Sequence, residues 1–402
     1  MLGMDMHTST FPLSRVARKI KRSVMRDLIA VASQPEVISF AGGLPAADCL
    51  PLEEVATCLD AVLTFEGRRA LQYGPPYRPL REWLAGYMQR RGVACTVDNI
   101  FITNGAQQAL EILGRLLLDP GEPAVVEALT FTGIGQVMQA HGARLRAAAM
   151  DLETGVDVDA YADALTRDGR PARVGAVIPD FHNPAGASLT AAKRAGLAAA
   201  AASAGVPLIE DDPYSLLRFA GETLPPIKAY DEAGLVLYIG SFSKIIAPAM
   251  RLGWIVAPAE LLPRLTVLRE SLDLESSQLL QRVVTEFLTR GCLDAHLQFL
   301  NAANLTRRNA MLAALERELG GLAAWTVPEG GLFLWVTLPE HIDTEALFAA
   351  ALENQVAYIP GVHFSAERAF TNALRLNYSN ATPERIDEGI RRLACVIRES
   401  TA

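Results

Sequence analysis

Residues 241–254, SFSKIIAPAMRLGW, place two cations in an otherwise apolar run. A lysine held among apolar residues near another cation tends to lose its proton, and Lys244 then becomes a candidate nucleophile. Ser241, Ser243 and Arg251 supply hydrogen-bond donors of the kind that bind a phosphate group. Taken by itself, Lys244 is more simply interpreted as a surface lysine.

A second stretch, IEDDPYSLLRF, ends a hydrophobic run with three acids. A carboxylate at a buried strand end needs a partner, because burying an unpaired charge is costly. Tyr214 follows Asp211 by three residues and adds a phenol to this group. A metal site or a solvated acidic loop is the alternative interpretation, although no obvious cluster of histidine or aspartate accompanies these acids.

Two turns follow other apolar runs. In TNGAQQAL a strand gives way to a helix, and the first N–H groups of that helix, at Ala106 and Gln107, suit an anion such as phosphate. In DFHNPAG, Asn183 precedes a proline, which favours an extended backbone that projects the amide side chain. Each segment alone is more simply an ordinary turn.

Alternating strands and helices must position these groups. Short runs rich in Val, Ile and Leu, with little polar alternation, predict strands that are buried on both faces. These runs are residues 99–105, 122–129, 174–180, 206–212 and 235–241. The alanine-rich residues 191–205 predict a crossover helix. We therefore expect an α/β fold with a mainly parallel sheet flanked by helices, whose carboxyl edge collects ligands.

The sequence pattern changes after about residue 290. A long helical stretch at residues 293–319 leads to the strand-like segments GGLFLWVTL and ALRLNYS, which predict a smaller α/β domain. We expect an N-terminal helix and substrate loop at residues 1–50, associated with the small domain. The large cofactor-binding domain would then span residues 51–293, and the small C-terminal domain residues 294–402.

Composition narrows the class of protein. The 402 residues carry 37 basic and 45 acidic side chains, a net charge of −8, which argues against a nucleic-acid partner. Five cysteines without a CxxC pair suit reduced thiols. No apolar run is long enough for a membrane span, and no signal-type block follows the basic N-terminus. We expect a cytoplasmic protein without a membrane or metal partner.

The candidate groups complement one another. They offer phosphate donors, a nucleophilic lysine, a carboxylate, a phenol and an amide, which are the groups that pyridoxal 5′-phosphate requires. The chain resembles the fold-type I, class I/II pyridoxal-phosphate-dependent aminotransferases. It is most similar to the branch that holds 2-aminoadipate and kynurenine aminotransferases and the catalytic domains of MocR-type regulators. The motifs that carry this resemblance are, in order, ISFAGGLP, LQYGP, TNGAQQAL, HNPAG, EDDPY, SFSK, APAMRLGW, PEGGLFLW and LRLNYS.

The resemblance implies roles around the cofactor ring. Lys244 would form the Schiff base and then shuttle a proton, and Asp211 would pair with the pyridine nitrogen. Tyr214 and Asn183 would hydrogen-bond the ring hydroxyl oxygen. Phe131, where many relatives have tyrosine, would stack on the ring.

The resemblance also implies how the phosphate is held. Its ligands would be the side chains of Ser241, Ser243 and Arg251 and the backbone around Ala106 and Gln107. Ala106 stands where relatives often carry serine or threonine, so one hydroxyl contact is lost. Tyr73, in LQYGP, would reach the phosphate of a neighbouring subunit, which implies an obligate homodimer with active sites at the subunit interface.

Substrate recognition follows from the same resemblance. Arg375 would bind the α-carboxylate of an amino acid or 2-oxo acid, a role that suits its planar guanidinium. Gly43 and Asn183 would lie against the substrate. Arg26, on the N-terminal helix, would recognise the distal carboxylate of glutamate or 2-aminoadipate, and the helix would move aside for aromatic or branched substrates. Alternatively, Arg26 is one solvated charge on a basic helix.

We therefore expect ping-pong transamination between an L-amino acid and a 2-oxo acid. The nearest alternative is another reaction of the same cofactor, a β-elimination or a decarboxylation, which motifs do not distinguish. A MocR-type regulatory domain is less favoured, since only about forty residues precede AGGLP. An oxidoreductase is remote because the sequence has no GxGxxG fingerprint.

Overall fold

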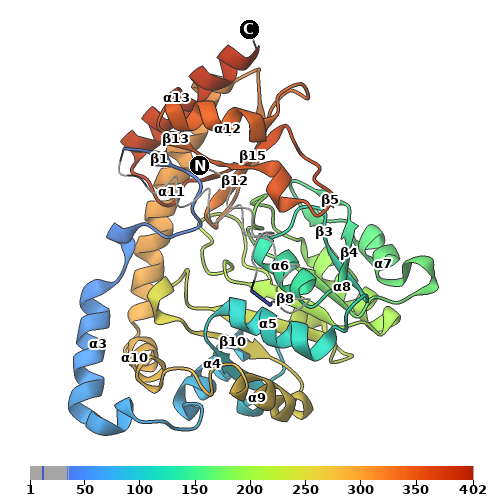
Figure 1. Cartoon of the computed structure of the whole chain (residues 1–402). Coiled ribbons are helices and arrows are strands. Elements are labelled where there is room, and N and C mark those ends of the chain that lie inside the picture. The colour runs from blue at the N-terminus through green and yellow to red at the C-terminus, as the bar shows by residue number, and fades with distance from the viewer. Residues whose placement is uncertain (1–10, 13–33, 35, 402) are drawn as a thin grey trace.

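Figure 1 shows the computed structural model of the chain, which describes residues 11–12, 34 and 36–401. A seven-stranded sheet with flanking helices forms the larger part of the molecule. A four-stranded sheet with its own helices forms the smaller part, drawn in orange and red. None of the helices in the described residues is long and apolar enough to cross a membrane.

The large sheet is mainly parallel, as the sequence predicts. Its strand order is β2-β10-β9-β8-β7-β3-β4, and only β10 runs antiparallel to its neighbours. The strands are β2 (Ile100–Thr103), β3 (Pro123–Glu127), β4 (Arg144–Ala148), β7 (Val174–Val177), β8 (Leu208–Asp212), β9 (Val236–Ser241) and β10 (Gly253–Val256). The five strands predicted from apolar runs are present, whereas β4 and β10 were not predicted.

The register of the sheet brings distant residues to one edge. Gly253 of β10 pairs with Thr103 of β2 on one side and with Ser241 of β9 on the other. Strand β8 lies next to β9, with Asp211 opposite Ile239. Because β2, β8 and β9 run the same way, their carboxyl ends meet where β10 begins.

The helices of the larger part follow sequence signals. Helix α8 begins after Thr190, whose hydroxyl accepts a hydrogen bond from the backbone N–H of Lys193, and ends at Gly205 in the left-handed conformation. The helices are α3 (Leu52–Phe65), α4 (Arg78–Arg90), α5 (Ala106–Leu117), α6 (Thr132–Ala140), α7 (Val158–Thr166), α8 (Ala191–Ala204), α9 (Leu262–Glu270) and α10 (Gln278–Thr289). A short hairpin joins β5 (Met150–Asp151) to β6 (Gly155–Val156).

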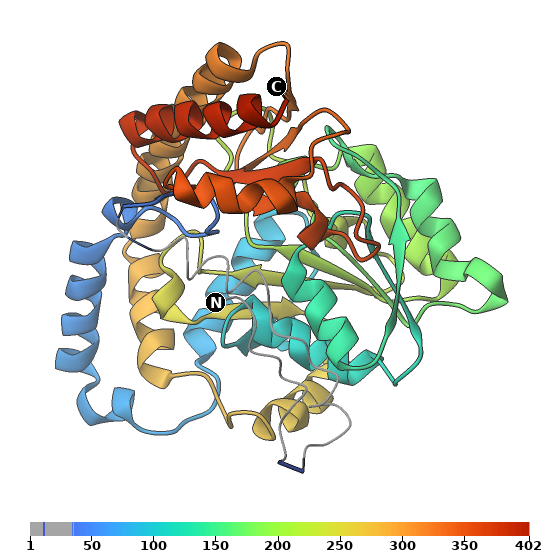
Figure 2. The same ribbon diagram turned by 45° about the horizontal axis from the view of Figure 1, so that its top comes forward.

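The long helix predicted after residue 290 is α11 (Cys292–Leu319), which runs from the larger part to the smaller one. The small sheet is antiparallel, in the order β11 (Ala324–Trp325), β12 (Phe333–Thr337), β15 (Ala373–Asn377) and β14 (Ile359–Pro360). Helices α12 (Thr344–Glu353) and α13 (Pro383–Thr401) pack with it (Figure 2).

The segment before α3 lies along the smaller part. Strand β1 (Ile38–Ser39) pairs with β13 (Val356–Ala357), and the carbonyl of Phe40 accepts the N–H of Asn377. This path carries Gly43 to the boundary between the two sheets. The predicted N-terminal helix, with Arg26, lies outside the described residues, and the division into three domains stays a prediction.

Candidate active site

A cavity of about 340 Å³ opens at the carboxyl edge of the large sheet. It brings together all but two of the predicted site residues: Gly43, Ala106, Gln107, Phe131, Asn183, Asp211, Tyr214, Ser241, Ser243, Lys244, Arg251 and Arg375. Tyr73 does not line it and is 77% exposed. Arg26 lies outside the described residues. The volume suits a small cofactor together with a substrate.

Backbone at the start of α5 forms one end of this cavity. The chain turns at Gly105, with φ of 81°, so that the first N–H groups of α5 are free of helical partners. A Cβ atom added at Gly105 would lie 2.7 Å from Nη2 of Arg251. Glycine tolerates this φ and leaves room for the guanidinium beside the turn.

Arg251 and two serines complete the same end. Arg251 has φ of 47° and donates from Nη2 to the carbonyl of Asn104 at 2.9 Å. The hydroxyl of Ser241 accepts the backbone N–H of Ser243 at 3.2 Å. A cation, two hydroxyls and helical N–H groups therefore surround one region, which we call the phosphate cradle (Gly105, Ala106, Gln107, Ser241, Ser243 and Arg251).

Lys244 lies within this cavity as an activated amine. Its Nζ donates to the carbonyl of Gly43 at 2.6 Å. Burial, together with the positive charges of Arg375 and Arg251, lowers the pKa of Lys244 to about 8. A substantial fraction of the side chain is thus neutral near physiological pH, as covalent attachment to a carbonyl carbon requires.

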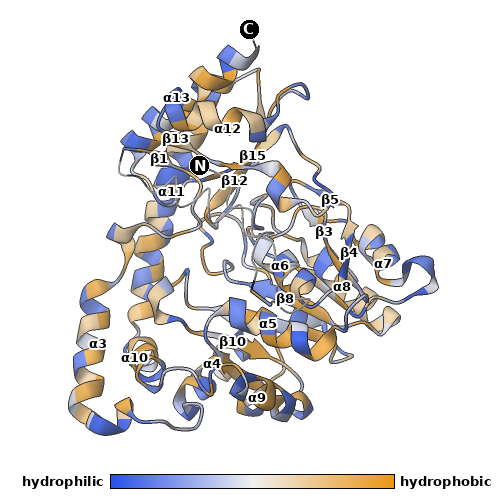
Figure 3. Cartoon of the chain, in the orientation of Figure 1, coloured by the Kyte–Doolittle hydropathy of each residue, from blue (hydrophilic) through white to orange (hydrophobic). Residues whose placement is uncertain are grey.

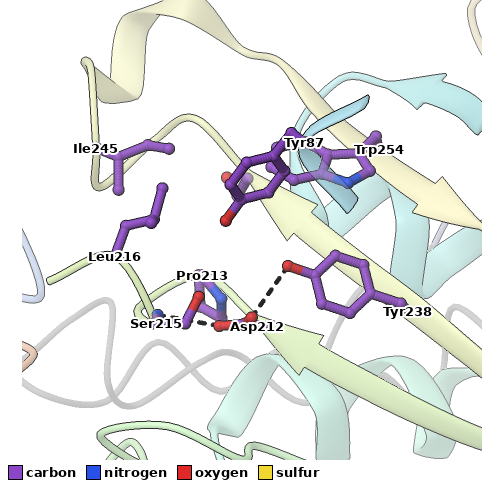
Figure 4. Close-up of a pocket in the computed structure, with 9 residues that line it drawn as sticks. Tyr87, Asp212, Pro213, Ser215, Leu216, Tyr238, Ile245 and Trp254 are labelled. Atoms are coloured by element: carbon purple, nitrogen blue, oxygen red, sulfur yellow. Dashed lines mark hydrogen bonds between the residues drawn. The ribbon is translucent and has the colours of Figure 1, made fainter. Parts of the chain in front are cut away.

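The three acids at the end of β8 have different surroundings. Glu210 accepts the backbone N–H groups of Ile227 at 2.6 Å and Lys228 at 2.8 Å. Asp212 pairs with Arg91 at 2.9 Å and also accepts hydrogen bonds from the Tyr238 hydroxyl and the backbone N–H of Ser215. Figure 4 shows the last two contacts as dashed lines from Asp212. Both flanking acids therefore have protein partners.

Asp211, between them, faces the cavity. It is almost fully buried, and its Oδ1 has no hydrogen-bond partner among the described residues. Burial, and then the negative charge of Asp212, raise the pKa of Asp211 to about 7. A buried carboxyl oxygen without a donor marks a place for a cationic or N–H ligand, and a pyridinium nitrogen fits this description.

Arg375, on β15 of the small sheet, lines the same cavity. Its Nη1 donates to Oδ1 of Asn183 at 2.8 Å, and its Nη2 donates to the carbonyl of Ala41. The guanidinium lies 4.2 Å from the ring centroid of Phe333 and 4.9 Å from that of Phe364. Burial lowers the pKa of Arg375 to about 10, which leaves it charged at neutral pH. It is a rigidly held cation that can receive a carboxylate.

Asn183 and Tyr214 connect the two sides. The amide of Asn183 donates to the Tyr214 hydroxyl at 3.5 Å, a long contact. Burial, and then the charge of Asp211, raise the pKa of Tyr214, so the phenol stays protonated and can donate. The Tyr214 ring meets Phe333 edge-to-face with centroids 6.0 Å apart.

Comparison with known proteins decides the family. Residues 36–393 match the family model for aminotransferase class I and II. The chain is 38% identical over 392 residues to aromatic-amino-acid aminotransferase 1 of Thermococcus litoralis, covering 96% of this chain and 94% of that protein. The chain is a class I and II aminotransferase.

Solved structures agree with this assignment. Kynurenine aminotransferase from Pyrococcus horikoshii, in complex with PMP, superposes with a TM-score of 0.93 at 36% identity and covers 97% of this chain and 98% of that one. The α-aminoadipate aminotransferase LysN from Thermus thermophilus, complexed with N-(5′-phosphopyridoxyl)-L-leucine, gives 0.88 at 35% identity, with 96% and 97% covered. The predicted fold type, pyridoxal phosphate dependence and transaminase chemistry of this aminotransferase are confirmed.

Four lining residues were missed by the sequence analysis, namely Thr132, Ile178, Pro213 and Phe333. Phe333 lies in PEGGLFLW, which the analysis used as a strand and a family motif. An aromatic residue so close to a Gly-Gly turn was a usable signal, because glycine permits close approach. No comparable signal distinguishes Thr132 or Ile178.

Proposed function

We propose that the cavity residues of this aminotransferase hold pyridoxal phosphate in the roles that the sequence predicts. When bound, the cofactor supplies an electron sink for negative charge that develops at the substrate α-carbon. Lys244 would hold the cofactor covalently, and its free amine would move a proton to or from that carbon. Asp211 would accept a hydrogen bond from the protonated ring nitrogen, which would give its buried Oδ1 a donor.

The other residues bind and orient. The phosphate cradle would receive the phosphate group, Phe131 would pack on the ring, and Tyr214 and Asn183 would donate to the ring hydroxyl oxygen. Arg375 binds the α-carboxylate of the amino acid or the 2-oxo acid. The orphaned Oδ1 of Asp211 supports this arrangement best, because the described chain offers it no donor.

We further propose that the amino donors include glutamate or 2-aminoadipate and that aromatic or branched amino acids are also accepted. The described lining residues contain three cations, and each already has a proposed role: Lys244, Arg251 and Arg375. A distal carboxylate therefore needs a cation from elsewhere, and Arg26 is our candidate. Phe333 and Ile178 give the lining apolar surface that suits an aromatic or branched side chain.

Replacing Arg26 with alanine tests this specificity. We expect kcat/KM for glutamate to fall roughly 10- to 100-fold, as for loss of a charged hydrogen bond, while kcat/KM for leucine stays within about twofold. Arg22→Ala, on the same predicted helix, is the matched control and should leave both unchanged. An equal loss for glutamate and leucine in Arg26→Ala would reject the role.

A homodimer with active sites at the subunit interface is the second part of the proposal. Apolar side chains are exposed on α3, the adjacent 3-10 turn (Gly67–Leu71) and the segment before α10. They are Leu52, Leu63, Phe65, Leu71, Leu272 and Leu274, and Phe65 is 85% exposed. Figure 3 colours much of α3 as hydrophobic. Large apolar side chains that are exposed on several elements support a protein interface.

Light scattering coupled to gel filtration tests the dimer. The native chain should elute with the mass of two subunits, and Phe65→Asp should shift it toward one. Val327→Asp, at an exposed apolar residue outside this surface, should leave the mass unchanged. A native monomer would contradict the proposal. The cytoplasmic location and the absence of a nucleic-acid partner stay predictions from composition.

A further inference from the structure

The loop that carries Tyr73 is exposed, yet it is held by buried polar side chains. Tyr73 and the prolines Pro75 and Pro76 are exposed, whereas Gln278 and Gln281 of α10 are almost fully buried. Burying an amide is favourable only when its hydrogen bonds are made. The side chains of Gln278 and Gln281 make most of their hydrogen bonds to the backbone of this exposed loop and of the segment before α10.

The contacts fix the backbone on the C-terminal side of Tyr73. Glu275 accepts the N–H of Gly74 with both carboxylate oxygens, at 3.2 and 3.3 Å. Gln278 donates to the carbonyls of Gly74 at 2.7 Å and Pro75 at 3.0 Å, and also to Glu275. Gln281 accepts the N–H of Tyr77 at 2.9 Å. Residues 74–77 are therefore tied to the start of α10.

A second layer holds this clamp, which consists of Glu275, Gln278 and Gln281. Arg282 donates to Oε1 of Gln278 at 2.6 Å and to Glu66 at 2.6 Å, and its guanidinium lies 4.4 Å from the Tyr77 ring centroid. The Tyr73 side chain does not line the cavity of its own chain. An exposed phenol beside a backbone that is held by these hydrogen bonds suits a contact outside this chain.

We propose that Glu275 and Gln278 are positioning residues for the partner subunit's cofactor, acting through Tyr73. This inference rests on the proposed dimer. With the backbone of Gly74 fixed, Tyr73 samples fewer conformations, so less entropy is lost when its hydroxyl contacts a phosphate across the interface.

Asp273, two residues before Glu275, contacts residues beside the phosphate cradle of its own chain. It accepts the side-chain amides of Asn104 and Gln108, which flank the phosphate cradle of the same chain, and it pairs with Arg269 at 3.3 Å. Asp273 should therefore affect the cofactor of its own subunit, and Glu275 that of the partner. Replacing Asp273 should weaken cofactor binding in the same subunit, and replacing Glu275 should weaken it in the partner subunit.

Hybrid dimers separate the two effects. In hybrid one, a chain carrying Lys244→Ala and Glu275→Ala is paired with a native chain of different mass. In hybrid two, a chain carrying only Lys244→Ala is paired with a chain carrying only Glu275→Ala. Borohydride fixes the cofactor covalently to Lys244, and intact mass spectrometry then detects it. The measurement therefore reports cofactor binding only in the chain that retains Lys244.

The expected result is a half-saturating pyridoxal phosphate concentration roughly three- to tenfold higher in hybrid one and close to native in hybrid two. Glu275→Gln, which keeps one acceptor oxygen, should give a smaller increase in hybrid one. Glu270→Ala, an exposed carboxylate at the end of α9, should change neither hybrid. Asp273→Ala should show the reverse pattern, with the loss in hybrid two.

Tyr73→Phe in the same hybrids distinguishes the failure of this inference from failure of the dimer arrangement. If Tyr73→Phe weakens cofactor binding across subunits while Glu275→Ala weakens it in neither hybrid, or only in hybrid two, the positioning role is wrong and the dimer stands. If Tyr73→Phe acts only within its own subunit, the proposed subunit arrangement itself is wrong, and the inference is rejected with it.

Discussion

The cavity floor and the Tyr73 loop use polar groups in opposite ways. On the floor, Asp211 is buried and its Oδ1 has no partner among the described residues, although Glu210 and Asp212 beside it are fully engaged. In the loop, the backbone beside Tyr73 is firmly hydrogen-bonded while the phenol itself is exposed. The unpaired buried carboxyl group supports a ligand inside this chain, and the exposed phenol beside a hydrogen-bonded backbone supports a contact outside it.

The largest expected effect comes from removing the amine on the floor. Lys244→Ala should lower the rate of the half-reaction with glutamate by about 10⁴-fold or more, because covalent attachment and proton transfer are both lost. Stopped-flow absorbance measures this rate. Lys193→Ala, at a lysine whose Nζ contacts Thr154 and Gly155 away from the cavity, is the control and should retain the native rate. A comparable loss in both would indicate a folding defect.

The next largest expected effect separates the adjacent acids Asp211 and Asp212. Asp211→Asn should lower kcat roughly 10³-fold, because the ring nitrogen loses its ionised partner. Asp212→Asn should keep kcat within about tenfold but lower the free energy of unfolding by about 2 kcal/mol, since Arg91 loses its buried counter-charge. Steady-state kinetics and urea unfolding of both variants check this. A greater kinetic loss in Asp212→Asn would contradict the assignment.

The unpaired state of Asp211 also predicts a pH dependence in the cofactor-free protein. Its pKa of about 7 lies above the usual value of 3.8, so its protonated form stabilises the fold at low pH, and this contribution is lost as pH rises from about 4 to about 7. Cofactor-free Asp211→Asn should therefore be more stable than the native chain by about 4 kcal/mol at pH 8, as a shift of this size implies.

The difference in the free energy of unfolding between Asp211→Asn and the native chain should shrink toward pH 4. Urea unfolding at pH 5, 6.5 and 8 measures it for both proteins. Because burial and Asp212 also raise the pKa of Glu210 to about 7, only the difference between the two proteins isolates Asp211. A difference that does not change with pH would show that Asp211 is not a buried, unpaired acid.

The smallest effect concerns the phosphate cradle. Ala106 opens α5 without a side-chain donor, so Ala106→Ser should tighten pyridoxal phosphate binding by roughly threefold, the value of one added hydrogen bond. Equilibrium titration of the cofactor-free protein measures the Kd. Ala106→Val adds bulk without a donor and should not tighten binding, and tighter binding in Ala106→Val would mean that packing explains the change.

The sequence predicted the parts of the site that depend on strand ends. Asp211, Ser241 and Asn183 follow buried apolar runs, and parallel strands bring such ends to one edge. The antiparallel strand β10 was missed because Gly253 and Trp254 were considered only as part of the lysine motif. The contacts of Asp212 with Arg91 and of Glu275 with Gly74 join residues 121 and 201 positions apart, and no local pattern encodes such pairs.

The visible absorption spectrum of the purified holoenzyme, before and after adding glutamate, tests transamination most directly. The cofactor band should bleach with glutamate and return when 2-oxoglutarate is added, because a transaminase that takes an amino group from glutamate must pass it on to a 2-oxo acid. A band that no amino acid bleaches would contradict this function. So would the release of ammonia or CO₂ without recovery of the band when a 2-oxo acid is added.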